Sequence, residues 1–398
     1  MANVIRAGAT GGRRPASWLA LLAALTAPLL AALAAGDAWA SPFPSRVYVA
    51  STGADANASA NCPLSAPCRT FATAVTVVAV GGDVVALDTG GFGPVTITRS
   101  LTLSGPAGTY AGITSANPGY GITINAPGGN VRIRGLTIET QQPNTAYTIN
   151  NGIGIMVLAA ANVSLENCVI AGFPYGGIMT LPSPLSTQAT PLTLNVIDTV
   201  FIESGNYAAI YLQPSNFKSG GTVTANIRHV SMNGYNLYTT SGNEGFLVGD
   251  GVSASIDDCQ VVNYLFGLIA TDQAGGNIYL AITNSVWNNA FWDVNASNNT
   301  PTSIGGGTAH LDLRNNLFTG TTTTNAAVLS ASGLPASFGG AFSMFGAGFA
   351  ASLNGNTFSG NSLAVNIDPA SVVSSYGNNH FATNGTDVTG TLTPILAK

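Results

Sequence analysis

The segment VRIRGLTI, residues 131–138, shows the pattern that decides the fold. Apolar residues alternate with polar ones, Gly follows at the fifth position, and an apolar residue stands three positions later. Eight further segments repeat this motif: VSLENCVI (163–170), LNVIDTVF (194–201), ANIRHVSM (225–232), ASIDDCQV (254–261), LAITNSVW (280–287), LDLRNNLF (311–318), ASLNGNTF (351–358) and SSYGNNHF (374–381). Self-similarity of this kind indicates one supersecondary unit stacked many times.

Two positions of the motif carry most of the structural information. The fifth is Gly, Asn or Asp in every repeat except one, and the eighth is always apolar. The fifth positions are Gly135, Asn167, Asp198, His229, Asp258, Asn284, Asn315, Gly355 and Asn378. The eighth positions are Ile138, Ile170, Phe201, Met232, Val261, Trp287, Phe318, Phe358 and Phe381. Gly, Asn and Asp tolerate a left-handed backbone, so the fifth position predicts a tight turn, and the eighth predicts a buried side chain.

The spacing of the repeats fits a coil of three short strands joined by turns. Six intervals between Gly135 and Asn315 cover 180 residues, an average of 30 per unit. We therefore predict an all-β protein with a single-stranded right-handed parallel β-helix of roughly ten coils, stacked about 4.8 Å apart. The segment TFATAVTVVAV (70–80) predicts a short N-terminal capping helix that begins after Thr70 and ends at Gly81 and Gly82.

Residues 1–40 predict a secretory signal peptide. Arg13 and Arg14 precede the apolar run WLALLAALTAPLLAALAA (18–35), and Ala38-Trp39-Ala40 form a cleavage site of the small-x-small type. The run is about as long as a helix that spans a bilayer, roughly 20 residues, so an uncleaved anchor is the alternative. We favour cleavage, which leaves residues 41–398 as one β-helix domain with no membrane span. This domain is expected to be secreted or to lie in the periplasm or cell envelope.

Charge and composition restrict the partners. Without residues 1–40 the chain has 9 Lys plus Arg (12 − 3) and 16 Asp plus Glu (17 − 1), a net charge of −7. We expect no nucleic-acid partner, because phosphate binding needs clustered cations. With only 7% charged residues, the surface consists mostly of neutral polar groups, which suit a polysaccharide. No cofactor is predicted, and the sequence leaves the oligomeric state open.

The four cysteines are expected to behave in two ways. Cys62 and Cys68 lie in the short loop NCPLSAPCRTF (61–71), where a disulfide forms easily in an oxidising compartment. Cys168 and Cys259 occupy the same motif position three units apart, which places them about 14 Å from each other. A disulfide spans about 4.4–6.8 Å between Cα atoms. We therefore predict that Cys168 and Cys259 are unpaired and buried.

The N-terminal segment resembles a known family. In CRTFATAVTVVAVGGDVV (68–85), Arg69-Thr70-Phe71, Ala74 and the later Gly82-Asp83 are similar to the start of the solenoid in bacterial right-handed parallel β-helix proteins of the pectin lyase-like superfamily. The resemblance implies the fold along nearly all of the exported chain. It implies no single activity, because that superfamily includes lyases, hydrolases, esterases, tailspikes and surface proteins.

One set of candidate catalytic residues lies in the turn column. Asp198, His229 and Asp258 fall on three successive repeats, so neighbours are expected about 5 Å apart and the two carboxylates about 10 Å apart. That separation is close to the range of roughly 6.5–9.5 Å in inverting glycosidases, and a histidine between acids moves protons readily. Arg228 adds a cation on the neighbouring face. The alternative is structural, because Asp caps turns as Asn and Gly do.

The residues one position before the turn column are expected to point outward. This places Arg134 one coil from Glu166, and Arg228 one coil from Asp257. We predict that both pairs form ion pairs across neighbouring strands, worth roughly 0.2–1 kcal/mol each. The alternative is that this outward face forms a substrate groove.

Aromatic residues near the loops form a second candidate set. Exposed rings would stack on sugar faces, whereas buried rings would fill the coil or hold loops to it. The residues proposed for substrate binding are Tyr207, Tyr211, Tyr235, Tyr238, Tyr264 and Trp292.

The catalytic signatures of the resembling superfamily are mostly absent. Of the four polygalacturonase-like signatures only Asp257-Asp258 matches, and no cluster of carboxylates has an evident calcium spacing, so no metal site is predicted. The sequence thus favours a secreted protein that binds a polysaccharide or a cell-surface component. The alternatives are a polysaccharide lyase or glycoside hydrolase that acts on a plant or bacterial glycan, and a structural rod.

Overall fold

The structure is a computed structural model. It describes residues 43–115, 119–140, 152–180, 191–204, 207–214, 221–234, 243–271, 275–289, 291–297, 307–321 and 340–395. The predicted signal peptide lies outside these residues, as do Tyr235 and Tyr238. Within them, no helix combines the length and apolar character needed to cross a membrane.

Three long parallel sheets, here called A, B and C, make up the described part of the chain. Sheet A contains β1 (Arg46–Val49), β2 (Gly82–Ala86), β5 (Leu101–Ser104), β8 (Asn130–Arg134), β11 (Asn162–Glu166), β14 (Leu192–Ile197), β17 (Val223–Arg228), β20 (Val252–Asp257), β23 (Asn277–Thr283), β26 (Thr308–Arg314), β29 (Phe349–Asn354), β32 (Val372–Ser375) and β35 (Leu392–Pro394).

Sheet B contains β3 (Gly90–Gly91), β6 (Ala111–Ser115), β9 (Leu136–Thr140), β12 (Val169–Ala171), β15 (Val200–Ile202), β18 (Ser231–Asn233), β21 (Gln260–Val262), β24 (Val286–Asn288), β27 (Leu317–Thr319), β30 (Thr357–Ser359) and β33 (His380–Ala382). Sheet C contains β4 (Val95–Ile97), β7 (Tyr120–Asn125), β10 (Ile153–Ala159), β13 (Gly176–Thr180), β16 (Ala208–Leu212), β19 (Glu244–Val248), β22 (Phe266–Thr271), β25 (Trp292–Ser297), β28 (Gly340–Phe345), β31 (Leu363–Ile367) and β34 (Thr386–Thr389).

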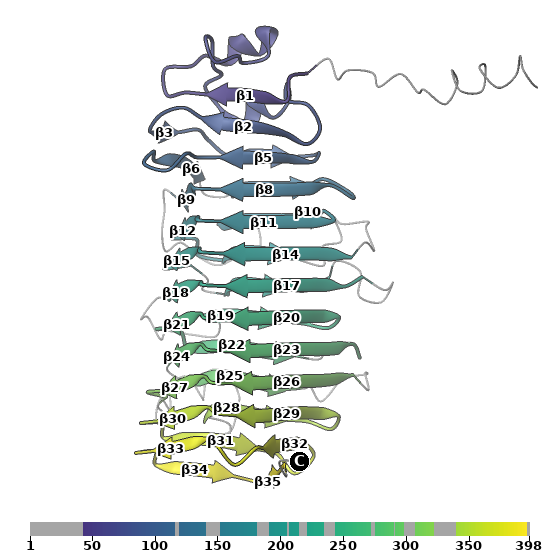
Figure 1. The fold of residues 1–398 in the computed structure, drawn as a ribbon, viewed down its shortest axis with the longest axis vertical. Helices are drawn as coiled ribbons and strands as arrows, with labels where there is room; N and C mark the ends of the chain where they lie inside the picture. The colour runs from purple at the N-terminus through teal and green to yellow at the C-terminus, as the bar shows by residue number, and fades with distance from the viewer. Residues whose placement is uncertain are drawn as a thin grey trace, which may run out of the picture. The chain divides into compact units, whose positions relative to one another are not determined.

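The chain passes from sheet A to sheet B to sheet C and then returns to sheet A one coil further along (Figure 1). Each strand pairs in parallel with the strand one coil before and one coil after it, as β14 does with β11 and β17. The winding is right-handed, as expected for connections between parallel strands. The predicted right-handed parallel β-helix is thereby confirmed.

The turn column forms the corner between sheets A and B. From β11 to β30, every connection at this corner consists of two residues. The first of them has a left-handed backbone, with φ near +50° even at His229 (52°). The prediction differs from the structure in the ninth repeat, where Gly377 takes the left-handed conformation in place of Asn378. A glycine one position earlier offers that conformation without a Cβ clash.

The interior is filled by the columns that the motif predicts. The eighth positions of the first eight repeats are fully buried, and Phe381 of the ninth is partly buried against the same core. Rings stack along the helix axis, with centroids 4.9 Å apart between Phe318 and Phe358 and 5.2 Å apart between Phe358 and Phe381. Sheet C makes room for these rings with small residues, since a Cβ on Gly177 would lie 2.7 Å from the Phe201 ring.

Buried asparagines form a ladder inside the A–B corner in the C-terminal coils. The side chain of Asn356 donates from Nδ2 to the Leu313 carbonyl at 2.8 Å. Its Oδ1 accepts from both the backbone N–H and Nδ2 of Asn316, each at 3.0 Å. The amide groups thereby satisfy turn backbone groups that two-residue connections leave unpaired.

The N-terminal coil contains two short helices, η1 (Asp55–Ala60) and α2 (Phe71–Ala74). Thr70 accepts a hydrogen bond from the Thr73 N–H and so caps α2, which is shorter than the helix predicted over residues 70–80. Helix α2 buries Phe71 and Ala74. A disulfide joins Cys62 to Cys68, and Cys168 and Cys259 are free and buried.

Removal of one asparagine side chain from the ladder should lower the free energy of unfolding substantially. Asn356→Ala leaves the Leu313 carbonyl and the Asn316 N–H without their partners, and we expect the free energy of unfolding to fall by about 2–4 kcal/mol. Urea denaturation followed by circular dichroism measures this change. The control is Asn226→Ala, which removes an exposed asparagine of sheet A and should cost less than about 0.5 kcal/mol. Equal losses in both variants would contradict this role of the ladder.

Candidate functional site

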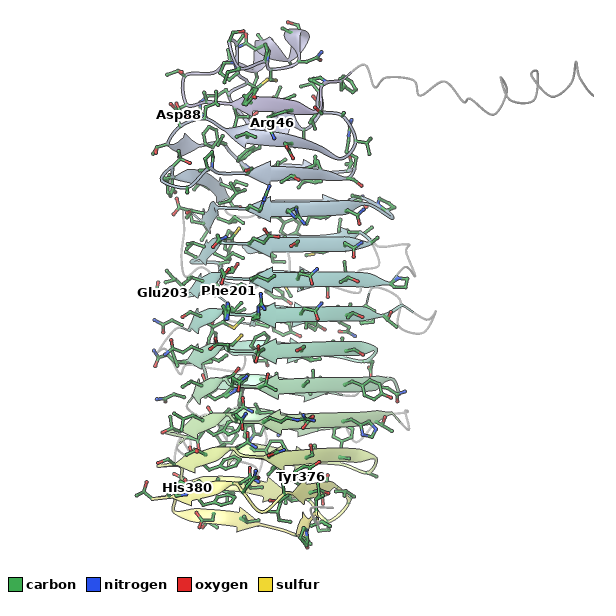
Figure 2. All side chains as sticks on the ribbon, in the orientation of Figure 1. Arg46, Asp88, Phe201, Glu203, Tyr376 and His380 are labelled. Carbon is green, nitrogen blue, oxygen red and sulfur yellow. A yellow bond between two sulfur atoms is a disulfide. The ribbon has the colours of Figure 1, made fainter. Side chains whose placement is uncertain are left out.

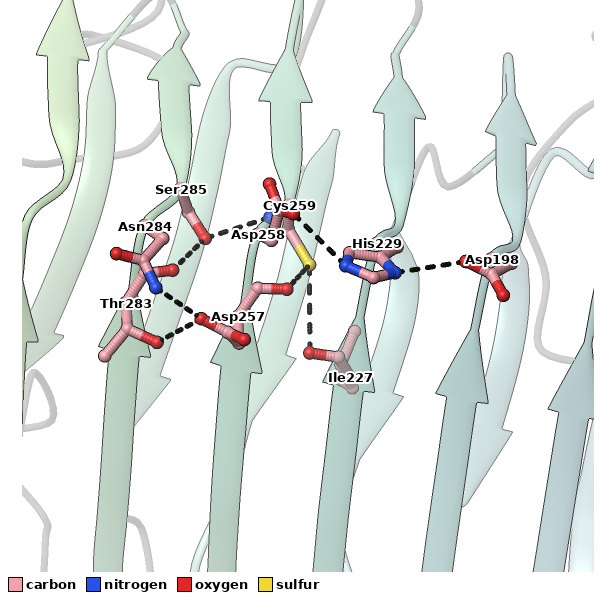
Figure 3. Close-up of polar contacts among 9 residues, drawn as sticks. All are labelled: Asp198, Ile227, His229, Asp257, Asp258, Cys259, Thr283, Asn284 and Ser285. Atoms are coloured by element: carbon pink, nitrogen blue, oxygen red, sulfur yellow. Dashed lines mark hydrogen bonds and ion pairs between the residues drawn. The ribbon is translucent and has the colours of Figure 1, made fainter.

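The structure brings Asp198, His229 and Asp258 together in one row at the A–B corner (Figure 3). His229 Nδ1 lies 3.2 Å from Asp198 Oδ1, and His229 Nε2 lies 3.2 Å from Asp258 Oδ2. All three backbones are left-handed. The side chains are about half exposed, at 48%, 47% and 64% respectively.

This row has the geometry of a ladder of polar contacts on the surface. Both ring nitrogens of His229 face protein carboxylates, which leaves neither of them directed at a substrate. The short A–B connections raise no wall beside the row, and it lines none of the three hollows described for this chain. Exposed ion pairs of this kind contribute roughly 0–1 kcal/mol to stability.

In the outward column one position before the turn, both predicted ion pairs are wrong, because the two carboxylates have other partners. Glu166 is in register with Arg134, but its carboxylate contacts Arg132 Nε at 3.5 Å. Asp257 is in register with Arg228, yet its Oδ1 accepts hydrogen bonds from Thr283 at 2.6 Å and from Asn284 at 2.8 Å. These two bonds, more than the charge of Arg228, hold the pKa of Asp257 below its usual range. Short polar groups on the next coil thus reach this carboxylate better than a long cation does.

Most of the predicted sugar-binding aromatics with described positions are buried. Tyr264 is fully buried, and its hydroxyl donates to the Ser204 carbonyl at 3.3 Å. Trp292 is 3% exposed and packs with Phe266 and Phe291, and Tyr211 is 8% exposed. These three rings are corrections to the predicted sugar platform, because each is used in packing.

Tyr207 belongs to an aromatic and apolar cluster on the outer face of sheet C. Its ring stacks on Tyr175 with centroids 5.0 Å apart and meets Tyr211 edge-on at 5.7 Å. The cluster also contains Ile153, Met156, Met179, Ala208 and Leu247. This second apolar layer lies outside the coil, and its rings contact one another closely.

Glu244, at the start of β19, is a buried carboxyl beside this cluster that the sequence did not reveal. Its Oε2 has no hydrogen-bond partner, and burial raises its pKa to about 8. The carboxyl is therefore mostly protonated at neutral pH, as expected where burying an unpaired charge is costly.

One hollow of the described surface lies on the outer face of sheet A and is here called the groove. Its volume is ≈ 660 Å³, and it crosses strands β17 to β32 and reaches Ile395, which follows β35. One outward column crosses its floor, and along this column Asp312 stands between the small residues Ser255 and Ala281 on one side and Ser352 on the other. The same column begins at the other end of sheet A with Arg46, whose side chain pairs with Asp83 at 2.9 Å (Figure 2).

Tyr279 and His310 form the aromatic part of the groove. They occupy register positions on the adjacent strands β23 and β26. Their rings are nearly parallel, at 9°, with centroids 5.4 Å apart, and Tyr279 is 47% exposed. One face of the Tyr279 ring is stacked on His310, and the ring stays partly exposed beside the column that contains Ser255, Ala281 and Asp312.

Asp312 is the acidic group of the groove, and its charge is compensated. Arg314 donates to Asp312 Oδ2, and the Ser352 hydroxyl donates to Oδ1 at 2.8 Å. Partial burial acts to raise the pKa of Asp312, but the bonds from Arg314 and Ser352 outweigh it and hold that pKa below the usual range. Asp312 is thus an ionised acceptor with a counter-charge beside it.

The signal for this site is present in the sequence as a simple alternation. In HLDLR (310–314), His310, Asp312 and Arg314 occupy every second position, so all three point to one face of a strand. Tyr279 has the same phase in NIYLAIT (277–283). The sequence predictions rested on the turn column and on the column next to it, so the residues two and four positions before that second column were missed.

No protein-family model and no curated protein sequence matches this chain. Solved structures do resemble it. Pectate lyase Pel9A shares 13% identity with a TM-score of 0.38, over 85% of this chain and 79% of that one. The lacto-N-biosidase of family GH136 from Eubacterium ramulus shares 9% with a TM-score of 0.45, over 85% and 67%. The A-module of the Azotobacter vinelandii mannuronan C-5 epimerase AlgE4 shares 12% with a TM-score of 0.38, over 80% and 91%. Values this low leave the function to be argued from the chain's own residues.

Among the described residues, no group of three or more His, Cys, Asp or Glu side chains is arranged to hold a metal ion.

The contacts of His229 with Asp198 and Asp258 predict that His229→Asn has a small effect on stability. Asparagine occupies the same column at Asn167, Asn284 and Asn315 and accepts the left-handed backbone. Only exposed ion pairs are lost, so urea denaturation should show a change within about 1 kcal/mol. If the row were catalytic, the variant would instead lose activity on a panel of polysaccharides, measured as reducing ends and as absorbance of unsaturated products.

The raised pKa of Glu244 predicts that the stability of the folded chain depends on pH. The folded chain keeps this carboxyl protonated up to about pH 8, whereas the unfolded chain releases the proton near 4.5. The free energy of unfolding should therefore fall as pH rises between these values, by up to about 1.4 kcal/mol per unit. Urea midpoints measured from pH 4 to 9 should show a flatter profile in Glu244→Gln than in the wild type.

The matched control for that measurement is Glu203→Gln, which changes an exposed glutamate after β15 (Figure 2). Its profile should follow that of the wild type. A Glu244→Gln profile that also follows the wild type would show that the carboxyl is ionised in the folded chain.

Proposed function

We propose that this chain binds a neutral polysaccharide in the groove on the outer face of sheet A. The observation that carries this proposal is the exposed Tyr279 ring, held parallel to His310 beside a floor of small side chains. An aromatic face supplies a large apolar contact area, and its hydroxyl remains free to bond at the edge. A sugar ring offers the matching surfaces, an apolar face rimmed by hydroxyl groups.

The polar lining of the groove supports an uncharged ligand. Thr224, Asn226, Ser253 and Ser255 present hydroxyl and amide groups, which both donate and accept hydrogen bonds. The ionised residue of the lining, Asp312, is paired with Arg314. A polyuronate would bring repeated negative charges to a chain whose own net charge is −5, with no free cation in the groove lining to receive them.

The predicted export fits this proposal, because it would expose the groove to extracellular or envelope glycans. The same surface could not select nucleic acid, since phosphate binding depends on clustered cations. Binding, rather than cleavage, is the activity that the groove supports. Its acidic side chain already accepts bonds from Arg314 and Ser352, and no second carboxylate lines it.

The decisive prediction concerns Tyr279→Ala. Affinity electrophoresis in gels containing xylan, mixed-linkage glucan or galactomannan should show retardation of the wild-type chain by at least one of them. The variant should lose about five- to thirtyfold in affinity, because the lost stacking contact is worth roughly 1–2 kcal/mol. Asp312→Asn should weaken binding less, since the amide still accepts a hydrogen bond.

Tyr110→Ala is the matched control, because Tyr110 is similarly exposed, at 40%, and lies outside the groove. It should be retarded like the wild type. If the wild type is not retarded by any neutral polymer, the binding proposal fails and a structural rod becomes the better reading.

A further inference from the structure

A second hollow lies on the same outer face of sheet A, toward the N-terminal coils. Its volume is ≈ 420 Å³, and its polar lining includes Asn130, Arg132, Asn162, Ser164 and Asn195. These residues come from β8, β11 and β14, and they continue the outward columns that form the groove.

The two hollows meet at one pair of asparagines. Asn195 on β14 lines the second hollow, and its register partner Asn226 on β17 lines the groove. Nδ2 of Asn226 donates to Oδ1 of Asn195 at 3.0 Å. Because β14 and β17 are adjacent strands, the lining of one hollow continues directly into the lining of the other.

The second hollow repeats the charge balance of the groove. Arg132 is the single charged residue of its lining, and Arg132 Nε lies 3.5 Å from a Glu166 carboxylate oxygen. Each hollow thus combines neutral amides and hydroxyls with one compensated charge. A ligand that suits one of them chemically also suits the other.

We propose that the two hollows form one continuous track for a single long neutral polysaccharide chain, laid along the stacking direction from β5 to β32. This inference rests on the proposed function of the groove. The ten sheet A strands from β5 to β32 extend over about 43 Å at about 4.8 Å per step. A trisaccharide contacts one hollow only, whereas a polymer contacts both, and its second contact becomes intramolecular.

The test compares polymer and trisaccharide binding in variants that obstruct the track far from Tyr279. The probes are soluble xylan with xylotriose, mixed-linkage glucan with cellotriose, and galactomannan with mannotriose, all measured by calorimetry. Ser164→Trp fills the second hollow, and Asn195→Trp obstructs the junction. Val200→Trp, at an exposed outward position of sheet B that is 37% exposed, is the matched control. Circular dichroism verifies that each variant folds.

The expected result is that the wild type binds the polymer at least about tenfold more tightly than the trisaccharide, per binding site. Ser164→Trp and Asn195→Trp should each reduce this ratio to near one without changing trisaccharide affinity, and Val200→Trp should leave both affinities unchanged. If polymer and trisaccharide bind alike, or if either tryptophan leaves polymer affinity intact, the continuous track is overturned and the groove alone remains. If no probe binds, or Tyr279→Ala has no effect, the proposed function itself fails.

Discussion

The structure depends on one constraint, the left-handed residue that turns the chain from sheet A to sheet B in the coils from β8 to β30. A connection of two residues with φ near +50° at its first position allows little variation. Each sheet B strand must therefore start at the same position relative to the sheet A strand before it, with its side chains alternating in the same order. Equivalent side chains of successive coils therefore lie directly above one another. A shift of a single residue would move every side chain of a strand to the opposite face. Columns rather than individual residues are thus the units of this fold.

The interior shows how a column can satisfy both polar and apolar requirements. A turn this short leaves backbone groups unpaired, and buried asparagines such as Asn316 and Asn356 meet that need in the C-terminal coils. The equivalent positions of earlier coils hold Cys168 and Cys259, whose thiols lie 3.4 and 3.3 Å from backbone carbonyls of their own coil. The two cysteines therefore fill ladder positions as small buried side chains, which explains why they occur three coils apart and unpaired. The burial that makes them useful there also raises the pKa of both thiols to about 11.

The sequence predicted the fold well because its signal is local and repeated. The spacing of Gly135, Asn167 and Asp198 identified the turn, and the apolar residues three positions later identified the core. The site was harder to predict for a physical reason. Whether Tyr264 or Tyr279 faces solvent depends on its phase within a strand, and Tyr264 lies at a connection, where alternation gives no phase. Glu244 was missed because its burial depends on neighbours from other coils. The pair formed by Arg132 and Glu166 shows that register fixes which Cα atoms are adjacent, but not which long side chains meet.

The constraint that builds the core also shapes the outer face of sheet A. Connections on either side of sheet C range from two residues (160–161) to twenty (320–339), so the surroundings of sheet C change from coil to coil. Sheet A keeps one register over the same coils, and its outward positions can vary without disturbing a turn. Small residues on either side of Asp312 in its central column, with Tyr279 and His310 alongside, make a hollow that needs no loop. A surface made in this way repeats at the spacing of the strands, and a ligand that is itself a repeating linear chain is the one that can use the successive coils in the same manner.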